Sequence, residues 1–488
     1  MRKTALPRKF TVKLAVIIVA LLIGGIFFFV NIPQQQSQAA ERRVMSINRR
    51  PARTVCGKPG KNSVECHAHV VTTSSGNPVS TSTPYTGTYG PTQFHVGYNL
   101  PCTPGGAVQS ICPQPTTFGP QTIAIVDAYN DKTIENDLQV YSNYYGLPSC
   151  TQANGCLIIR NQNGTTSLPR TTNSGWALET SLDVEVAHAM CQTCKILLIE
   201  TNSNSWNNLA TGVNTAARLG ATAISNSYGG GEWSGENSYD AYYNHPGIAV
   251  TASAGDNGYG AEYPAASNGV VAVGGTTLTL YSDSTYADES AWSGTGSGCS
   301  LYENANSWQT ALPNWGQTGC GNKRGIADVS ADADPNTGAA VYDSTTYNGT
   351  KGWYQVGGTS LASPIIASVY ALTGGVPAGI NASQIPYANA ATAYFHDVLG
   401  GTNGTCATSM CLSDIGYDGP TGLGTPNGIL GFALQAINTP TPTPTVVPIA
   451  TPTPTPTTAV PTATPTPTIA PTATPTVTPT PRPRRHGR

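Results

Sequence analysis

Short apolar runs alternate with segments of helical spacing through the middle of the chain. Five runs have the length and composition of buried strands: Thr122–Val126, Ile196–Ile199, Ala223–Asn226, Ile248–Ala252 and Val270–Val273. Three stretches carry apolar residues at helical spacing: Ile134–Tyr145, Glu179–Met190 and Trp206–Arg218. This alternation predicts an α/β fold in which a mainly parallel sheet is covered by helices on both faces.

The first forty residues have the pattern of an export signal. Basic residues between Arg2 and Lys13 precede an apolar run from Leu14 to Val30, and Ser37-Gln38-Ala39 offers a small-x-small cleavage site. The run is just short of a comfortable membrane span. Residues 1–40 are therefore expected to be a cleaved signal or an N-terminal anchor, and either places the core outside the cytoplasm.

Two further segments lack the apolar periodicity of the core. Residues 41–84 are rich in Ser, Thr and Pro and are expected to be a mostly disordered leader. In residues 437–488, uncharged Thr-Pro repeats predict an extended, disordered stalk, and the chain ends in basic residues from Arg482 to Arg488. Such ends allow association with a cell wall or membrane surface. Residues 85–436 remain as the folded domain, which we expect to be monomeric.

The twelve cysteines agree with export, because they are even in number and fall in close pairs. The simplest hypothesis is that neighbours form disulfides: Cys56 with Cys66, Cys102 with Cys112, Cys150 with Cys156, Cys191 with Cys194, Cys299 with Cys320, and Cys406 with Cys411. Sequence alone does not fix this connectivity. The Cys191 and Cys194 pair has a second interpretation, as a redox motif or half of a zinc site.

Composition excludes one class of function. The formal net charge is −2, charged residues make up 10% of the chain and the pI is near 6.4. A protein that binds nucleic acid usually carries a basic face or a high pI. We therefore expect no nucleic-acid partner.

A serine stands at the start of one predicted helix. Gly357-Gly358-Thr359-Ser360 leads into an apolar run that reaches Leu372. The glycines predict a turn that delivers Ser360 to the first turn of a buried helix, where a hydroxyl can face a cleft. Ser360 is therefore the candidate nucleophile, although an ordinary helix N-cap would explain it equally well if it stood alone.

Two carboxyls are the candidate base for this serine. A serine nucleophile needs a neighbouring base, most often a histidine, but none of the seven histidines lies in a His-Gly-Thr-His sequence. Glu179 and Asp183 lie four apart in a segment of helical spacing, so they share one helix face. Such a pair is expected to share a proton. An isolated pair of this kind is more often a solvated helix face.

Taken together and in this order, the motifs resemble the sedolisin family of serine-carboxyl peptidases, over roughly residues 85–436. That family carries a Glu and an Asp four apart on a helix, and a serine four residues before a proline. The matching residues here are Glu179, Asp183, Ser360 and Pro364. The turn Ser253-Ala254-Gly255-Asp256 supplies Asp256 at the position of the family's oxyanion-hole acid.

The resemblance implies a subtilisin-like fold and an endopeptidase that hydrolyses proteins or peptides. Glu179 would take the proton of Ser360, Asp183 would support Glu179, and Asp256 would donate a hydrogen bond to the oxyanion. The base must be ionised while Asp256 stays neutral. Acidic pH meets both demands most easily, so we expect activity well below neutrality.

Two other function classes remain open. A catalytically silent homologue would keep the fold and act as a surface binding protein. A histidine-dependent subtilisin-like protease would use Asp127 and His188 and would work best at neutral pH. No motif of such enzymes surrounds His188. We therefore expect Asp127 to be a strand-end residue near the cleft and His188 to be structural.

Sedolisin-like enzymes also bind calcium near the end of the domain, and the resemblance implies a Ca²⁺ site here. Asp397 and Asp418 would supply carboxylates, and Val398 and Gly416 would supply carbonyls. Asp414 stands where the family often has Gly and offers a further oxygen. This mixture suits calcium, which takes six to eight oxygen ligands. Turn-forming Asp residues among Gly and Pro are the alternative.

The chain departs from the family at its N-terminal side. Sedolisins usually carry a large folded prosegment that blocks the site, whereas about 45 residues separate the expected signal from Tyr85 here. Arg42–Thr83 is not expected to fold as an inhibitor, so control by a prosegment is in doubt. A smaller departure is Ala254 and Asn257 beside Asp256, where the family often has Gly and Ser.

Overall fold

The structure is a computed structural model that describes residues 42–101, 121–390 and 392–434. At its centre is an eight-stranded sheet in the order β12-β11-β9-β7-β4-β6-β5, with β15 beside β11. The strands are β4 (Thr122–Ala128), β5 (Leu157–Asn161), β6 (Lys195–Thr201), β7 (Ala223–Asn226), β9 (Ala249–Ser253), β11 (Val271–Leu280), β12 (Tyr286–Ala291) and β15 (Val329–Asp332). All pairs are parallel except β11 with β12. The predicted mainly parallel sheet is confirmed.

The helices follow the apolar spacing of the sequence. They are α1 (Pro91–Gly97), α2 (Ile134–Tyr145), α3 (Ser174–Met190), α4 (Trp206–Arg218), α5 (Asp240–Tyr243), α6 (Ser307–Thr310), α7 (Thr359–Leu372) and α8 (Gln384–Ala388). The bounds of α2 and α4 are those predicted. Helix α3 begins earlier, because the side chain of Asn173 accepts hydrogen bonds from the first free N–H groups of the helix.

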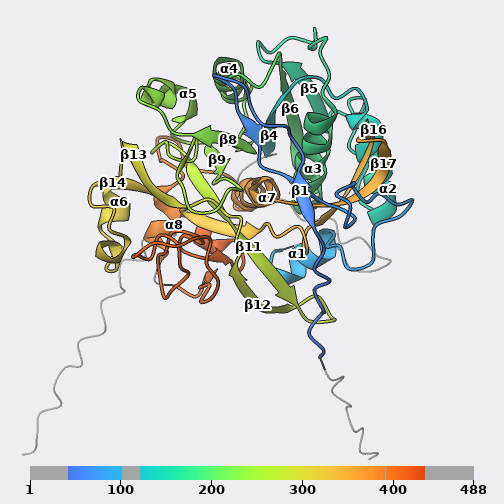
Figure 1. Ribbon diagram of the computed structural model, residues 1–488. Coiled ribbons are helices and arrows are strands. Elements are labelled where there is room, and N and C mark those ends of the chain that lie inside the picture. The colour runs from blue at the N-terminus through green and yellow to red at the C-terminus, as the bar shows by residue number, and fades with distance from the viewer. Residues whose placement is uncertain (1–41, 102–120, 391, 435–488) are drawn as a thin grey trace, which may run out of the picture. The chain divides into compact units, whose positions relative to one another are not determined.

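Helices cover both faces of the sheet (Figure 1). On one face α4 packs closely on β4, because a Cβ at Gly212 would lie 2.8 Å from Cγ1 of Val126. Successive strand residues point to opposite faces, so Asp127 points away from α4. On that second face α3 packs against α7, which lies at the centre of the view in Figure 1. The fold therefore brings the end of β4, the middle of α3 and the start of α7 together.

The segment before Tyr85 corrects one expectation. Residues 41–84 were expected to be mostly disordered, but from residue 42 onward the structure describes them as an ordered part of the fold. They contain β1 (Ala52–Thr54), β2 (Glu65–Cys66) and β3 (His69–Val71), and Val64 and Val70 are fully buried.

The strands of this segment join two small sheets. One has the order β1-β3-β17-β16 and the other β10-β8-β2. Their remaining strands are β8 (Tyr228–Gly231), β10 (Glu262–Tyr263), β16 (Ala339–Tyr347) and β17 (Thr350–Gly357). Two-stranded sheets are formed by β13 (Gly298–Asn304) with β14 (Lys323–Ile326) and by β18 (Phe395–His396) with β19 (Thr425–Pro426). The leader strands are only two or three residues long, which is too short for an apolar periodicity to appear, so pairing with strands distant in the sequence defines them.

Five of the expected disulfides are present. They join Cys56 to Cys66, Cys150 to Cys156, Cys191 to Cys194, Cys299 to Cys320, and Cys406 to Cys411. The pairing of neighbours is confirmed for these, and Cys191 and Cys194 are a local crosslink rather than half of a zinc site. The expected pair of Cys102 and Cys112 lies outside the described residues.

The predictions for the two ends of the chain also lie outside the described residues. They concern the signal or anchor in residues 1–40 and the Thr/Pro-rich stalk in residues 437–488. Within the part of the chain that the structure describes, none of the helices combines the length and hydrophobicity needed to cross a bilayer.

Candidate active site

Ser360 lies at the start of α7, fully buried. The turn before it needs glycine, because Gly358 has φ +99° and a Cβ there would overlap the carbonyl oxygen of His67 and Oδ2 of Asp256. Four residues on, Pro364 lacks the N–H that would bond the Ser360 carbonyl. Oγ of Ser227 lies 3.4 Å from that carbonyl oxygen instead. The backbone of the serine is thus fixed from both sides.

Ser227 links this serine to the acids of α3. Oγ of Ser360 donates to the Ser227 carbonyl oxygen over 3.1 Å, and Oγ of Ser227 donates to Oδ1 of Asp183 over 2.9 Å. Asp183 is fully buried. Burial and the charge of Asp127 raise the pKa of Asp183 well above its usual range, against the effect of the Ser227 hydrogen bond.

Glu179 lies one helical turn before Asp183 and is also fully buried. Burial raises the pKa of Glu179 well above its usual range, and the charges of Asp183 and Asp127 raise it further, while the Ser360 hydroxyl lowers it. Among the described residues, neither Glu179 oxygen has a hydrogen-bond partner, since the Ser360 hydroxyl is turned to Ser227. An unpartnered buried carboxyl beside a hydroxyl is ready to accept its proton.

Asp127 is closer to this cluster than the sequence suggested. It is fully buried at the end of β4, and burial raises its pKa to about 7, with a further increase from Asp131 and a decrease from Thr180. Because its charge raises the pKa of both Glu179 and Asp183, the cluster contains three coupled carboxyls. The sequence did carry a signal for this: Asp127 ends an apolar strand, and a predicted helix carries two acids on one face.

Asp256 lies in the loop after β9, on the other side of Ser360. Its Oδ1 accepts hydrogen bonds from the Thr359 backbone N–H (2.8 Å) and hydroxyl (2.7 Å), and Oδ2 has no hydrogen-bond partner in the described chain. Burial raises the pKa of Asp256, while His69, His67 and the Thr359 bonds lower it. Oδ2 lies next to Gly358 and 3.8 Å from Nε2 of His69, and when protonated it is positioned as a hydrogen-bond donor.

His188 is engaged elsewhere. Nε2 of His188 lies 2.9 Å from the Pro148 carbonyl oxygen, to which it donates, and burial lowers the pKa of His188. His188 forms no ion pair with Asp127 among the described residues. It lies near the sulfurs of Cys150 and Cys156, but their disulfide leaves them unavailable to a metal. The structure therefore does not bring Asp127 and His188 together as a base for Ser360.

The expected calcium ligands lie in two loops around β18. The Asp418 carboxylate is fully buried and accepts hydrogen bonds from the backbone N–H groups of Thr421 (2.9 Å) and Asp414 (3.1 Å). Asp397 accepts from the N–H of Gly416 at 3.1 and 3.2 Å. The Asp414 side chain instead accepts from the N–H of Ile415, within its own turn.

These loops bring carboxylate oxygens together, and no basic side chain in the described part of the chain neutralises their charge. Asp397 is close enough that its charge adds to the effect of burial in raising the pKa of Asp418. Within the described residues, none of the three carboxylates forms an ion pair. The carboxylates of Asp397 and Asp418 therefore fit calcium, and the Val398 and Gly416 carbonyls stay predicted ligands.

Comparison with known proteins identifies the family of this fold. Residues 161–415, just over half of the chain, match the Subtilase family (Peptidase S8). Kumamolisin of Bacillus sp. (strain MN-32) is 32% identical over 301 residues, which cover 54% of this chain and 52% of kumamolisin. Sedolisin of Pseudomonas sp. (strain 101) is 35% identical over 183 residues, which cover 34% of this chain and 29% of sedolisin. The chain thus spans at most about half the length of these curated relatives.

A solved structure shows the same similarity. Pseudomonas sedolisin, a serine-carboxyl proteinase complexed with two molecules of pseudo-iodotyrostatin, superposes with a TM-score of 0.55 and 25% sequence identity. The superposition covers 70% of this chain and 95% of the sedolisin chain. The chain therefore belongs to the subtilase family, and within it to the sedolisins.

Proposed function

We propose that this protein is a secreted serine-type endopeptidase that hydrolyses peptide bonds of proteins at acidic pH. The observation that supports it is the convergence of Ser360, Glu179, Asp183 and Asp256 around the start of α7. They come from two helices and a loop, and all are buried. The similarity to kumamolisin and sedolisin supports the same chemistry.

In this mechanism each group has one task. Oγ of Ser360 attacks the carbonyl carbon of the peptide while its proton passes to Glu179. Negative charge on Asp183 and Asp127 stabilises the protonated Glu179. The carbonyl oxygen becomes negative and accepts hydrogen bonds from the Ser360 backbone N–H and from protonated Asp256, which form the oxyanion hole. Glu179 then returns the proton to the leaving amine.

The pH dependence follows from the two demands on protonation. Burial raises the pKa of Asp256, so this acid stays a donor to higher pH than an exposed Asp would. As pH rises further Asp256 ionises, and the oxyanion loses its donor. Burial also raises the pKa of Glu179, Asp183 and Asp127, so the base is lost once pH falls far enough that all three are protonated. The rate should therefore peak in acid and fall toward neutrality.

Export is supported by the sequence and by the disulfides. The basic and apolar pattern of residues 1–40 is that of a signal or anchor. Five disulfides in one domain are typical of proteins that fold outside the reducing cytoplasm.

The test is hydrolysis of a mixed peptide library from pH 3 to pH 8. We expect the native protein to cleave at acidic pH, and Ser360→Ala and Glu179→Gln each to lose roughly a thousandfold or more in kcat/KM. Glu135→Gln, a matched change on α2, should leave the rate unchanged. A protein that folds but hydrolyses no peptide at any pH would instead be a silent binding protein, and an optimum at pH 7 to 8 would contradict the carboxyl base.

We also propose that the site around Asp397 and Asp418 binds a calcium ion. When bound, calcium would neutralise the two carboxylates and tie the Gly416 loop to β18, so its role would be structural. In protein freed of metal, we expect calcium to raise the thermal unfolding temperature. At a hundred times its dissociation constant, calcium would stabilise by about 2.7 kcal/mol.

Asp418→Asn should remove this response to calcium, whereas Asp283→Asn, an exposed change near the N-terminal segment, should keep it. The measurement is the unfolding temperature with chelator and after calcium is restored. Unfolding temperatures that are the same with and without calcium would mean that these Asp residues only shape the loops.

A further inference from the structure

The segment from Glu65 to His69 passes directly beside Ser360, whose backbone N–H donates to His67. On the upstream side β2 pairs antiparallel with β8, with Glu65 opposite Gly229 and Cys66 opposite Tyr228. On the downstream side β3 pairs antiparallel with β17, with His69 opposite Gly357. The chain is therefore held in extended form on both sides of His67, as a peptide is when it adds a strand to the edges of a groove.

His67 itself lies against the serine. The Ser360 backbone N–H donates to the His67 carbonyl oxygen over 2.9 Å, and the His67 N–H donates to the Ser227 carbonyl oxygen over 3.1 Å. Oγ of Ser360 donates to that same Ser227 oxygen. The Ser227 carbonyl oxygen thus accepts hydrogen bonds from both the Ser360 hydroxyl and the His67 N–H. The His67 carbonyl oxygen and Oδ2 of Asp256 both lie beside Gly358.

The side chain of His67 fills a pocket formed by Ser253, Glu262 and Gly229. The ring is buried, with Nδ1 2.7 Å from Oγ of Ser253 and Nε2 3.0 Å from Oε2 of Glu262. A Cβ at Gly229 would lie 2.6 Å from Cε1 of the ring, so β8 forms one close wall. Because both ring nitrogens are occupied, this histidine is held by its pocket and is not a base for Ser360.

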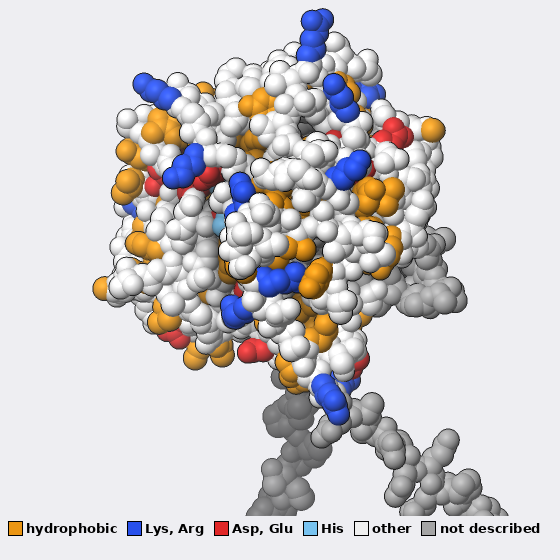
Figure 2. Space-filling view, turned by 45° about the vertical axis from the view of Figure 1, so that its right-hand side comes forward, with side chains coloured by type: hydrophobic (Ala, Val, Ile, Leu, Met, Phe, Trp, Pro, Cys, Tyr) orange, Lys and Arg blue, Asp and Glu red, His pale blue; other side chains and the backbone are white. Residues whose placement is uncertain are grey.

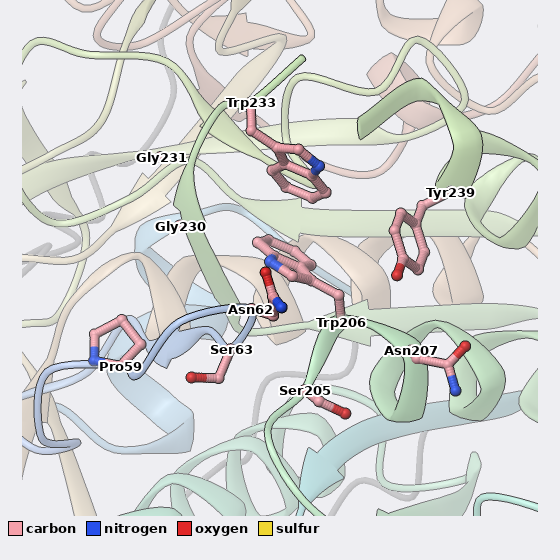
Figure 3. Close-up of a pocket in the computed structure, with 10 residues that line it drawn as sticks. All are labelled: Pro59, Asn62, Ser63, Ser205, Trp206, Asn207, Gly230, Gly231, Trp233 and Tyr239. Atoms are coloured by element: carbon pink, nitrogen blue, oxygen red, sulfur yellow. The ribbon is translucent and has the colours of Figure 1, made fainter. Parts of the chain in front are cut away.

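Upstream of β2 the segment passes an aromatic cavity of about 570 Å³ (Figure 3). Asn62 and Ser63 line it together with Gly230 of β8, and the rings of Trp206 and Trp233 face each other across 4.8 Å. The groove therefore continues along β8 beyond the residues that pair with it.

We infer that the bond between His67 and Ala68 is a self-cleavage site, held by residues 64–69 in the position of a substrate of the chain's own Ser360. This inference rests on the proposed function and adds the bond that is cut and the pocket that selects it. Until the bond is cut, the segment occupies the groove and excludes other peptides.

The chemistry uses groups already in place and one water molecule. Oγ of Ser360 bonds to the His67 carbonyl carbon, its proton moves to Glu179, and the electron pair of the C=O bond moves to the oxygen. When the C=O bond re-forms, the bond to the Ala68 nitrogen breaks, and that nitrogen leaves as an amine with the proton from Glu179. Water then attacks the ester and gives a proton to Glu179, which returns it to Ser360. The products are a His67 carboxylic acid and a free Ala68 amine.

No described disulfide would keep the cut segment attached. Cys56 and Cys66 are joined to each other, and both lie before the cut. The segment before the cut would then be held by noncovalent contacts alone, among them backbone pairs of β1 with β3 and of β2 with β8, ion pairs of Arg42 with Asp283 and of Arg49 with Asp334, and hydrogen bonds from Arg50 to Asn336 and Gln355. Release of the segment would open the groove along β8 and the cavity beside Trp206.

The test uses the full chain, held at acidic pH and followed by intact mass and N-terminal sequencing. We expect a new amino terminus at Ala68 in the native protein, formed with a first-order rate constant that does not depend on protein concentration. Ser360→Ala should show no such cut while keeping its unfolding temperature. The matched change Ser282→Ala should be cut like the native chain, and His67→Glu, which faces Glu262 with a like charge, should be cut at least tenfold more slowly.

Peptide-library hydrolysis measured on the same samples separates this inference from the proposed function. Hydrolysis of the library by a chain still intact between His67 and Ala68, or cut elsewhere, would overturn the self-cleavage site and leave the endopeptidase standing. An apparent first-order rate constant that rises in proportion to protein concentration would overturn cleavage by the chain's own serine. Loss of both activities in the native protein would overturn the endopeptidase, and the self-cleavage site with it.

Discussion

The contact between His67 and Glu262 shows how one side chain sets the chemistry of the pocket beside Ser360. Burial alone would lower the pKa of His67, but the Glu262 carboxylate raises it overall. Burial alone would likewise raise the pKa of Glu262, and His67 lowers it overall. Each residue thus stabilises the charged form of the other, and the pocket is suited to a cationic side chain.

This pocket predicts a preference for the residue before the cleaved bond. Peptides with His, Arg or Lys there should be hydrolysed faster than peptides with Asp or Glu, because a buried carboxylate attracts a cation and repels an anion. Glu262→Gln should reduce the ratio of kcat/KM values between Arg and Glu peptides at least tenfold. Glu135→Gln should leave it unchanged.

The measurement is kcat/KM for peptides that differ only at this position, at one acidic pH. Equal rates for Arg and Glu peptides, or a ratio that Glu262→Gln does not alter, would show that another group selects the side chain.

At the scale of elements, the sequence predicted what local pattern determines. The bounds of α2 and α4 were correct, since the apolar stripe of a surface helix repeats within each turn. The pair Glu179 and Asp183 was placed on one helix face by spacing alone, and the structure confirms that placement. The turn before Ser360 was predicted from two glycines, one of which has the positive φ that glycine allows.

What the sequence did not predict depends on contacts between distant segments. Strand β2 has two residues and pairs with β8, more than 160 positions later. Two residues are too few to show an apolar periodicity, so the pattern of residues 41–84 does not predict this strand. The same holds for His67, whose partners Ser253 and Glu262 lie far along the chain. Asp127 was assigned to the cleft, but its coupling to Glu179 depends on how β4 packs against α3.

At the scale of the whole molecule, the distribution of acids is unusual. On the face in Figure 2, Asp and Glu side chains are separate groups among uncharged atoms, whereas many other acids are buried. Burial is the largest cause of a raised pKa in Asp127 (to about 7), Asp131 (about 6), Glu200 (about 8), Glu289 (about 7) and Asp343 (about 8). All of these groups bind protons more tightly in the folded than in the unfolded chain.

The sign of the resulting pH dependence follows from linkage. In the unfolded chain these carboxyls titrate near 4, so between pH 4 and pH 7 the folded state holds more protons and its stability falls as pH rises. Each such group contributes about 1.4 kcal/mol for every pH unit between its two pKa values. Glu262, with its lowered pKa, acts in the opposite direction, but it is one group against several.

We therefore expect the folded domain to be more stable at pH 4 than at pH 7, with an unfolding temperature that falls by at least several degrees. Thermal unfolding of Ser360→Ala measures this without self-digestion. Adding Glu200→Gln should reduce the change between the two pH values, because the amide does not ionise, whereas adding Glu135→Gln should not. Stability that rises toward neutrality would mean that the buried acids are ionised in the folded protein, and a cluster that does not retain protons could not keep Asp256 as a donor in the oxyanion hole.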